Sequence, residues 1–187
     1  MEITHLYTAK GGQGCTVTAA LLALQKPGRT LIVDAALVAD MPAVLGIYPP
    51  IDWDVTCGVA AVVTPTISLV RDHVDLNLYG WDYDHVIYDH GLDEPPDYHG
   101  DDKWILVTRG CYVALKHALS HDRRPDGVIL LIEEGRALRA DDVTATLGAP
   151  IIASALVDRS VARKVEAGLL VYRNTRTDLL IHQEVNI

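Results

Sequence analysis

A short glycine-rich segment, Gly11–Gly14, lies between two runs of different periodicity. Ile3–Thr8 before it has the length and apolar character of a strand, and Thr16–Gln25 after it has helical spacing that Lys26-Pro27-Gly28 stops. Glycines at a strand-to-helix turn allow successive backbone N–H groups to converge on phosphate oxygens, and the helix N-terminus adds positive potential. The segment therefore predicts a phosphate-binding loop, although a turn of this kind can also be a tight connection without a ligand.

Strand-length apolar runs and helical segments alternate along the rest of the chain. This alternation predicts a single doubly wound α/β domain over residues 1–187, with a mostly parallel sheet of about seven strands and helices on both faces. Residues 48–80 are the hardest to assign, with a helix expected at Val59–Val63 and an edge strand at Leu76–Tyr79. The other expected strands are Thr30–Asp34, Asp84–Asp89, Trp104–Thr108, Gly127–Ile132 and Ile151–Ser154, and the other expected helices are Ala39–Leu45, Tyr112–Ser120, Ala140–Leu147 and Val161–Ala167.

Composition excludes several classes of protein. The chain has 187 residues, of which 49% are hydrophobic, enough for the core of one domain. Its three cysteines are far apart and odd in number, as expected of a reduced cytoplasmic protein rather than a disulfide scaffold. No signal peptide or membrane-spanning run is visible. The C-terminal segment Leu179–Ile187 is short and lacks a basic face, so membrane attachment through an amphipathic helix is not expected. The net charge of −9 would repel polyanions, and any nucleic-acid binding would need a local basic patch.

The order of residues in Lys10-Gly11-Gly12-Gln13-Gly14-Cys15-Thr16 is more specific than a glycine turn. It resembles the deviant Walker A loop of the ParA/MinD family of partitioning and positioning ATPases, which implies a P-loop NTPase-like fold. The resemblance extends over most of the chain; the alternative is another parallel-sheet fold with a chance glycine loop. Further similar segments are Leu31–Asp34, Asp40–Gly46, Tyr83–Asp89 (the Walker B strand), Leu106–Arg109 (where relatives often have Thr and Pro) and Ser154–Gly168.

The resemblance implies roles for individual residues. Lys10 would be the signature lysine that reaches the partner's nucleotide across a dimer interface; otherwise it is a solvent-facing residue at a turn. ATP or ADP would lie on Lys10, Gly11, Gly12, Gln13, Gly14, Cys15 and Thr16, and Mg²⁺ would be held by Thr16 and by Asp89. Lys10, Asp34 and Asp40 are the candidate catalytic residues.

Three departures from the family pattern predict weak or absent hydrolysis. Cys15 stands where the in-line Walker lysine is expected, and a thiol cannot supply a fixed cation for the phosphates. Cys15 is either a low-pKa thiolate at a helix N-terminus or a small residue that fills the space of a lysine. Ala36 replaces a second carboxylate, for which Asp40 is the nearest substitute. Glu133-Glu134 stand where relatives often have an Asn that recognises the adenine base, so the sequence does not fix which nucleotide base is preferred.

Other polar groups give weaker signals. A basic cluster lies near the C-terminal end of the sequence: Arg159, Arg163, Lys164, Arg173 and Arg176. ParA-like proteins use basic residues near this end of the chain for non-specific DNA binding, and the resemblance implies the same role here. The alternative is a helix face whose charge is balanced by neighbouring carboxylates. His117 and His121 are spaced as on a zinc-binding helix but lack a third ligand, and Asp93–Asp102 is an acidic loop.

The leading hypothesis is a ParA-like nucleotide-binding homodimer that positions or partitions DNA or another cargo. It would work with a ParB-like partner protein, and the assembly could extend to a filament. Two alternatives are a pseudo-ATPase that forms a structural dimer or filament without nucleotide, and a slow working ATPase.

Overall fold

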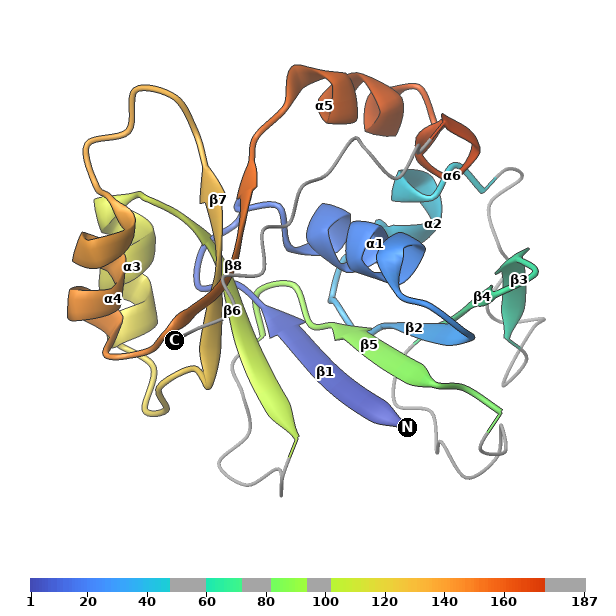
Figure 1. The fold of residues 1–187 in the computed structure, drawn as a ribbon, viewed down its shortest axis with the longest axis horizontal. Coiled ribbons are helices and arrows are strands. Elements are labelled where there is room, and N and C mark those ends of the chain that lie inside the picture. The colour runs from blue at the N-terminus through green and yellow to red at the C-terminus, as the bar shows by residue number, and fades with distance from the viewer. Residues whose placement is uncertain (48–59, 72–81, 94–101, 174–187) are drawn as a thin grey trace.

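The computed structural model describes residues 1–47, 60–71, 82–93 and 102–173. Eight strands form one sheet (Figure 1): β1 Glu2–Tyr7, β2 Thr30–Asp34, β3 Ala61–Thr64, β4 Ile67–Arg71, β5 His85–Asp89, β6 Lys103–Arg109, β7 Gly127–Ile132 and β8 Ile151–Leu156. Their order is β3-β4-β2-β5-β1-β6-β7-β8, and every neighbouring pair is parallel except β3–β4. The doubly wound, mostly parallel α/β fold predicted from the sequence is confirmed.

Helices cover both faces of the sheet. The described helices are α1 Cys15–Gln25, α2 Met41–Val44, α3 Tyr112–Leu119, α4 Ala140–Leu147, α5 Arg159–Glu166 and α6 Leu170–Arg173. α1, α2, α5 and α6 lie on one face, and α3 and α4 on the other (Figure 1). None of the helices in the described part of the chain is long and apolar enough to cross a bilayer.

Two apolar clusters hold these layers together. One joins α1, α2 and α5 to the sheet and includes Leu6, Ile32, Ile87 and Leu170. The other joins α3 and α4 to β6 and β7, around Trp104 and Leu106. All five residues of β2 are buried, which agrees with its continuous apolar sequence, because a central parallel strand is covered on both sides.

Within residues 48–80, which were the hardest to assign, one prediction from the sequence is wrong. Residues 61–64 form strand β3 rather than a helix, and they pair with β4 through a turn at Pro65 and Thr66. The β-branched residues Val62 and Val63 fit this hairpin, and proline cannot continue a helix. The hairpin helps bring the described strands to eight, one more than expected. The edge strand expected at Leu76–Tyr79 lies outside the described residues, and the helix expected at Ala39–Leu45 shortens to α2.

Candidate phosphate-binding site

The glycine loop joins the carboxyl end of β1 to α1, where the sequence placed it. Gly12 and Gly14 have φ values of 75° and 92°, in the left-handed region that favours glycine. A Cβ at Gly11 or Gly12 would meet no atom within 4 Å, whereas a Cβ at Gly14 would approach Leu131 Cδ1 to 2.9 Å. The first two glycines therefore face open space, and the third lets the loop pack against the end of β7.

A cavity of about 400 Å³ lies against this loop. It forms because β1, β2 and β5 are parallel neighbours whose carboxyl ends lie at one edge of the sheet. Thr16 and Asp40 both line the cavity, as does Asp93 from the segment after β5. The cavity is lined by Thr8, Gly11–Val17, Ala36–Val38, Asp40, Val44 and Gly91–Asp93.

Lys10 lies on the loop but not on the cavity wall. Its side chain is half-buried, and its Nζ atom is 3.4 Å from the carbonyl oxygen of Gly11. Within one subunit, then, the lysine contacts its own loop. The role of Lys10 across a dimer interface stays a prediction.

Two buried carboxylates lie side by side behind the cavity. Asp34 ends β2 and Asp89 ends β5, and the two are paired in register. Both are fully buried. Burial, together with the charge of Asp89, raises the pKa of Asp34 from 3.8 to about 6, although nearby Arg71 opposes this. Arg71 Nη1 lies 3.7 Å from Asp34 Oδ1, so the end of β4 provides the one cation that faces this pair among the described residues.

Cys15 lies next to Asp89 and is 4% exposed. Burial, and then the charge and acceptor oxygens of Asp89, raise the pKa of the Cys15 thiol well above its usual range. The low-pKa thiolate considered from the sequence is therefore wrong, because burial and the adjacent carboxylate outweigh the helix N-terminus. Cys15 is a small neutral residue in the place of the lysine.

The residues present fit a hydrated magnesium ion. Asp89 Oδ1 accepts the Gly91 N–H at 3.1 Å, while Oδ2 is buried and has no hydrogen-bond partner among the described residues. A hydroxyl on the cavity wall, from Thr16, and a carboxylate with a free oxygen suit Mg²⁺, which keeps several of its waters. Asp89 does not line the cavity directly, so it would act through such a water. The described residues contain no cluster of three or more His, Cys, Asp or Glu side chains with metal-binding geometry. His117 and His121 therefore have no third ligand among the described residues.

Ala36 is packed tightly in the wall of the cavity. It is buried, and a Cβ at Gly91 would approach its Cβ to 2.9 Å. The position where the family has a second carboxylate thus lies against the segment that follows β5. Asp40, exposed at the start of α2, is on the same cavity wall and remains the candidate substitute.

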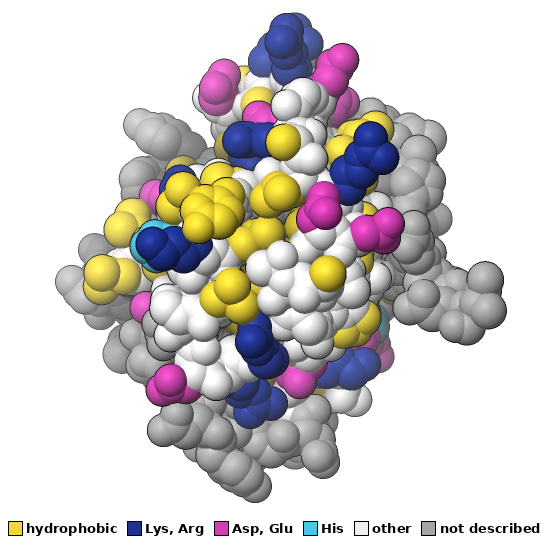
Figure 2. Space-filling model, turned by 90° about the vertical axis from the view of Figure 1, so that its left-hand side faces the viewer, with side chains coloured by type: hydrophobic (Ala, Val, Ile, Leu, Met, Phe, Trp, Pro, Cys, Tyr) yellow, Lys and Arg dark blue, Asp and Glu magenta, His cyan; other side chains and the backbone are white. Residues whose placement is uncertain are grey.

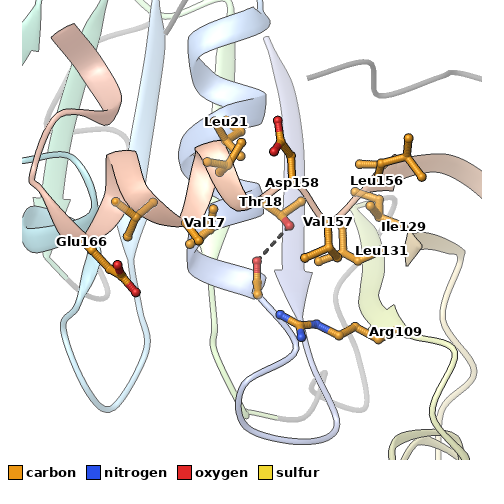
Figure 3. Close-up of a pocket in the computed structure, with 15 residues that line it drawn as sticks. Val17, Thr18, Leu21, Arg109, Ile129, Leu131, Leu156, Val157, Asp158 and Glu166 are labelled. Carbon is orange, nitrogen blue, oxygen red and sulfur yellow. Dashed lines mark hydrogen bonds between the residues drawn. The ribbon is translucent and has the colours of Figure 1, made fainter. Parts of the chain in front are cut away.

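A second cavity, of about 270 Å³, lies between α1, α5 and the ends of β7 and β8 (Figure 3). Its wall is mainly apolar, with Arg109 at one end. Gly14 and Val17 line both cavities, so the two meet at the start of α1. Sequence reasoning did not identify this cavity, because its wall combines residues from elements far apart in the chain.

The predicted basic cluster is partly described. Arg159 and Arg163 are exposed on α5, and neither forms an ion pair with a described carboxylate. Lys164 is partly buried. Arg173 ends α6, and Arg176 lies outside the described residues. DNA binding through this cluster and the alternative of a charge-balanced helix face both stay predictions.

Comparison with known proteins gives matches among solved structures only. No protein-family model and no curated protein matches the chain. The cell-division ATPase MinD of Pyrococcus furiosus has a TM-score of 0.68 and 19% identity, over 94% of this chain and 92% of that one. A ParA family ATPase from Chlorobium tepidum has a TM-score of 0.59 and 16% identity, over 91% and 90%. An ATP complex of a point variant of Cyanothece McdA has a TM-score of 0.60 and 15% identity, over 91% and 89%.

The chain has the fold of the MinD and ParA-family ATPases. The resemblance seen in the loop and strand motifs thus extends to the whole described structure. At 15–19% identity these three matches establish the fold, and the activity must be argued from the site.

Proposed function

We propose that this protein is a ParA/MinD-like nucleotide-binding protein that acts as a dimer in partitioning or intracellular positioning, with impaired ATP hydrolysis. The observation that carries the proposal is the open glycine cradle, with Thr16 on the wall of its cavity and the carboxylate of Asp89 behind it. A solved structure of the same fold is an ATP complex. We propose that residues 1–187 form one such domain and act in the cytoplasm.

The two cavities suit the two halves of a nucleotide. The phosphates would lie on the backbone N–H groups of Gly11–Thr16, at the positive end of α1. The base would lie in the apolar cavity beyond Gly14 and Val17. When bound, Mg²⁺ would neutralise phosphate charge, with the Thr16 hydroxyl as a ligand and Asp89 orienting a coordinated water.

The same residues explain why hydrolysis would be weak. Cys15 brings no charge to the β- and γ-phosphates, and Ala36 cannot orient an attacking water. In this proposal Asp40 is the acid left on the wall to take that role, with Lys10 of the partner subunit supplying charge. A pseudo-ATPase is the second candidate function, and the buried, neutral Cys15 favours it. A slow ATPase would require Lys10 and Asp40 to compensate.

Calorimetry with ATP and ADP in the presence of Mg²⁺, followed by sizing in each state, tests the proposal. We expect binding of both nucleotides and a shift toward dimer with ATP. No binding at millimolar concentration, with an unchanged oligomeric state, would support the pseudo-ATPase instead. Phosphate release above background that is lost in Lys10→Ala would support the slow ATPase.

We also propose a local DNA-binding surface on α5. Arg159 and Arg163 are exposed and unpaired with described carboxylates, and Lys164 follows them. A protein of net charge −9 would bind DNA there only through a few phosphate contacts, so binding should fall steeply with salt. Charge reversal of Arg159, Arg163 and Lys164 should abolish it.

A ParB-like partner and filament assembly belong to the same proposal. A pull-down with candidate partner proteins would test for the ParB-like partner.

A further inference from the structure

Arg109 ends β6 and is joined directly to the glycine loop. Its backbone N–H donates to Gln13 Oε1 at 2.9 Å, and Gln13 is only 4% exposed within the loop. The bond links residues far apart in the sequence, and burial shields it from water. The position of Arg109 is therefore fixed relative to the loop that would hold phosphate.

The guanidinium of Arg109 lies where the two cavities meet. Arg109 lines the second cavity together with Gly14, Val17 and Thr18. Its side chain points from the end of β6 toward the first turn of α1, where Val17 and Thr18 are drawn (Figure 3). A phosphate chain that continues from the loop toward the apolar cavity would pass this group, because Gly14 and Val17 form the wall between them.

Little of the hydrogen-bonding capacity of this guanidinium is used by the described residues. Arg109 Nε is buried and has no hydrogen-bond partner there. Nη1 forms an ion pair with Glu133 Oε1 at 3.7 Å, which is beyond hydrogen-bond distance. The other oxygen of Glu133 accepts the Nε–H of Arg136 at 2.6 Å, so two arginines share the charge of this carboxylate.

Two carboxylates also line the second cavity, and neither forms an ion pair with Arg109. Asp158 lines the cavity, but its carboxylate accepts the N–H of Ser160 at 2.7 Å and the hydroxyl of Ser160 at 2.6 Å. Glu166 lies at the other end of α5 and is exposed. The cavity thus has a cation at its loop end and an apolar middle.

We propose that Arg109 binds phosphate oxygens of the nucleotide and supplies, from the end of β6, positive charge that the loop lacks at Cys15. The inference rests on the proposed nucleotide-binding function and names a further binding residue of that site. A guanidinium presents several donors in a fixed plane, which suits adjacent phosphate oxygens. Gln13 is a positioning residue, because it holds the backbone of Arg109 against the loop.

Titration of wild type and Arg109→Gln with ATP and ADP in Mg²⁺ tests the inference. We expect Arg109→Gln to weaken ATP binding about ten-fold or more, as for loss of a hydrogen bond to a charged group. Lys116→Gln is the matched control, since it removes an exposed cation on α3 that lines neither cavity, and should change affinity less than about two-fold. Arg109→Lys, which keeps the charge but loses the planar fork, should lie between.

Thermal shifts with ligand fragments separate phosphate binding from base binding. Millimolar tripolyphosphate should raise the Tm of wild type more than that of Arg109→Gln, while adenosine should shift both equally. ATP affinity equal in wild type and Arg109→Gln, or a loss confined to adenosine, would overturn this inference alone. Wild-type protein that binds neither ATP nor ADP would overturn the proposed function and this inference together.

Discussion

Asp34 and Asp89 place two carboxylates side by side at the ends of two central strands, where water cannot separate their charges. Burial and the charge of Asp89 therefore raise the pKa of Asp34 from 3.8 to about 6. The native state holds this proton up to about pH 6 and the unfolded chain releases it near 3.8, so stability falls as pH rises between these values. Above pH 6 the ionised Asp34 costs about 2–3 kcal/mol of unfolding free energy.

Asp34→Asn should therefore stabilise the ligand-free protein at pH 8 by about 1–3 kcal/mol, since it removes the buried charge. The gain should shrink as pH falls through 6 and nearly vanish by pH 4, where Asp34 is protonated in the native state and close to half protonated in the unfolded chain. Urea unfolding at pH 4, 6 and 8 measures this. Asp84→Asn, on an exposed carboxylate, is the control, and a gain independent of pH would contradict the assignment.

Cys15 gives a second prediction at the scale of one residue. Cys15→Lys restores a cation at the loop, and we expect ATP affinity to rise about ten-fold or more. Cys15→Ala keeps the position small and neutral, and should bind ATP within a few-fold of wild type. Calorimetry with Mg²⁺ decides between them. An equal gain in the alanine variant would mean that relief of packing, rather than charge, limits binding.

Cys111 differs from Cys15 although both begin helices. It is partly exposed, and hydrogen bonds from the backbone of Ala114 and Val113, with the charges of Arg136 and Lys10, lower the pKa of its thiol. Iodoacetamide at pH 7.5 should alkylate Cys111 at least about ten times faster than Cys15, as peptide mapping by mass spectrometry would show. Lys10→Ala should slow the reaction at Cys111. Equal rates at the two cysteines would contradict their different environments.

At the scale of elements, α2 and α5 approach each other through two glycines. A Cβ at Gly46, where φ is 73°, would come within 2.1 Å of the backbone oxygen of Gly168. Gly148, at the end of α4, has a similar φ of 64° and open space around it. The two positions therefore share the backbone strain of a left-handed residue and differ in the contact.

Gly46→Ala should lower the unfolding free energy by about 3 kcal/mol or more, because backbone atoms must separate. Gly148→Ala should cost only about 1 kcal/mol, the strain of placing alanine in the left-handed region. Urea unfolding of both variants gives the comparison. Equal losses would show that α2 and α5 yield to the added methyl group.

The elements themselves were predictable where their patterns were long or continuous. β2 and β7 and helix α4 have the predicted limits, because each is bounded by turn or capping residues. The β3–β4 hairpin was missed, because its short apolar run lacks a clear periodicity and its stability comes from pairing with β2. Arg71 was missed for the same reason, since its contact with Asp34 requires the β2–β4 register.

At the scale of the whole molecule, exposed hydrophobic side chains collect at the edge of the sheet that carries the glycine loop. Leu37 and Val38 follow β2, Leu92 follows β5, and Leu156 and Val157 lie at the end of β8. On the side that carries α3 and α4, hydrophobic side chains also lie at the surface among lysines and arginines (Figure 2). Exposed apolar side chains around a polar cavity are typical of an interaction surface, and the proposed dimer would cover this one.

Leu37→Asp should therefore weaken ATP-dependent dimerisation at least about ten-fold, because Leu37 is 88% exposed and burying a carboxylate there is costly. Leu119→Asp, at the end of α3, adds the same charge outside this edge and should leave dimerisation unchanged. Sedimentation velocity with ATP and Mg²⁺ compares the variants. Equal dimerisation in wild type and Leu37→Asp would place the interface elsewhere.

Outside the β3–β4 hairpin, the sequence by itself determined the order of the described strands and of helices α1 to α5, and it determined the position of the glycine loop, because hydrophobic periodicity and glycine conformational freedom act over a few neighbouring residues. It also determined that Cys15 cannot supply a positive charge to a ligand and that Ala36 cannot supply a carboxylate. Only the tertiary structure decided which groups meet: Asp34 with Asp89 and Arg71, Gln13 with Arg109, and the two cavities at Gly14. These contacts depend on strand register and helix packing, which bring together residues tens of positions apart, and on burial, which sets their charge.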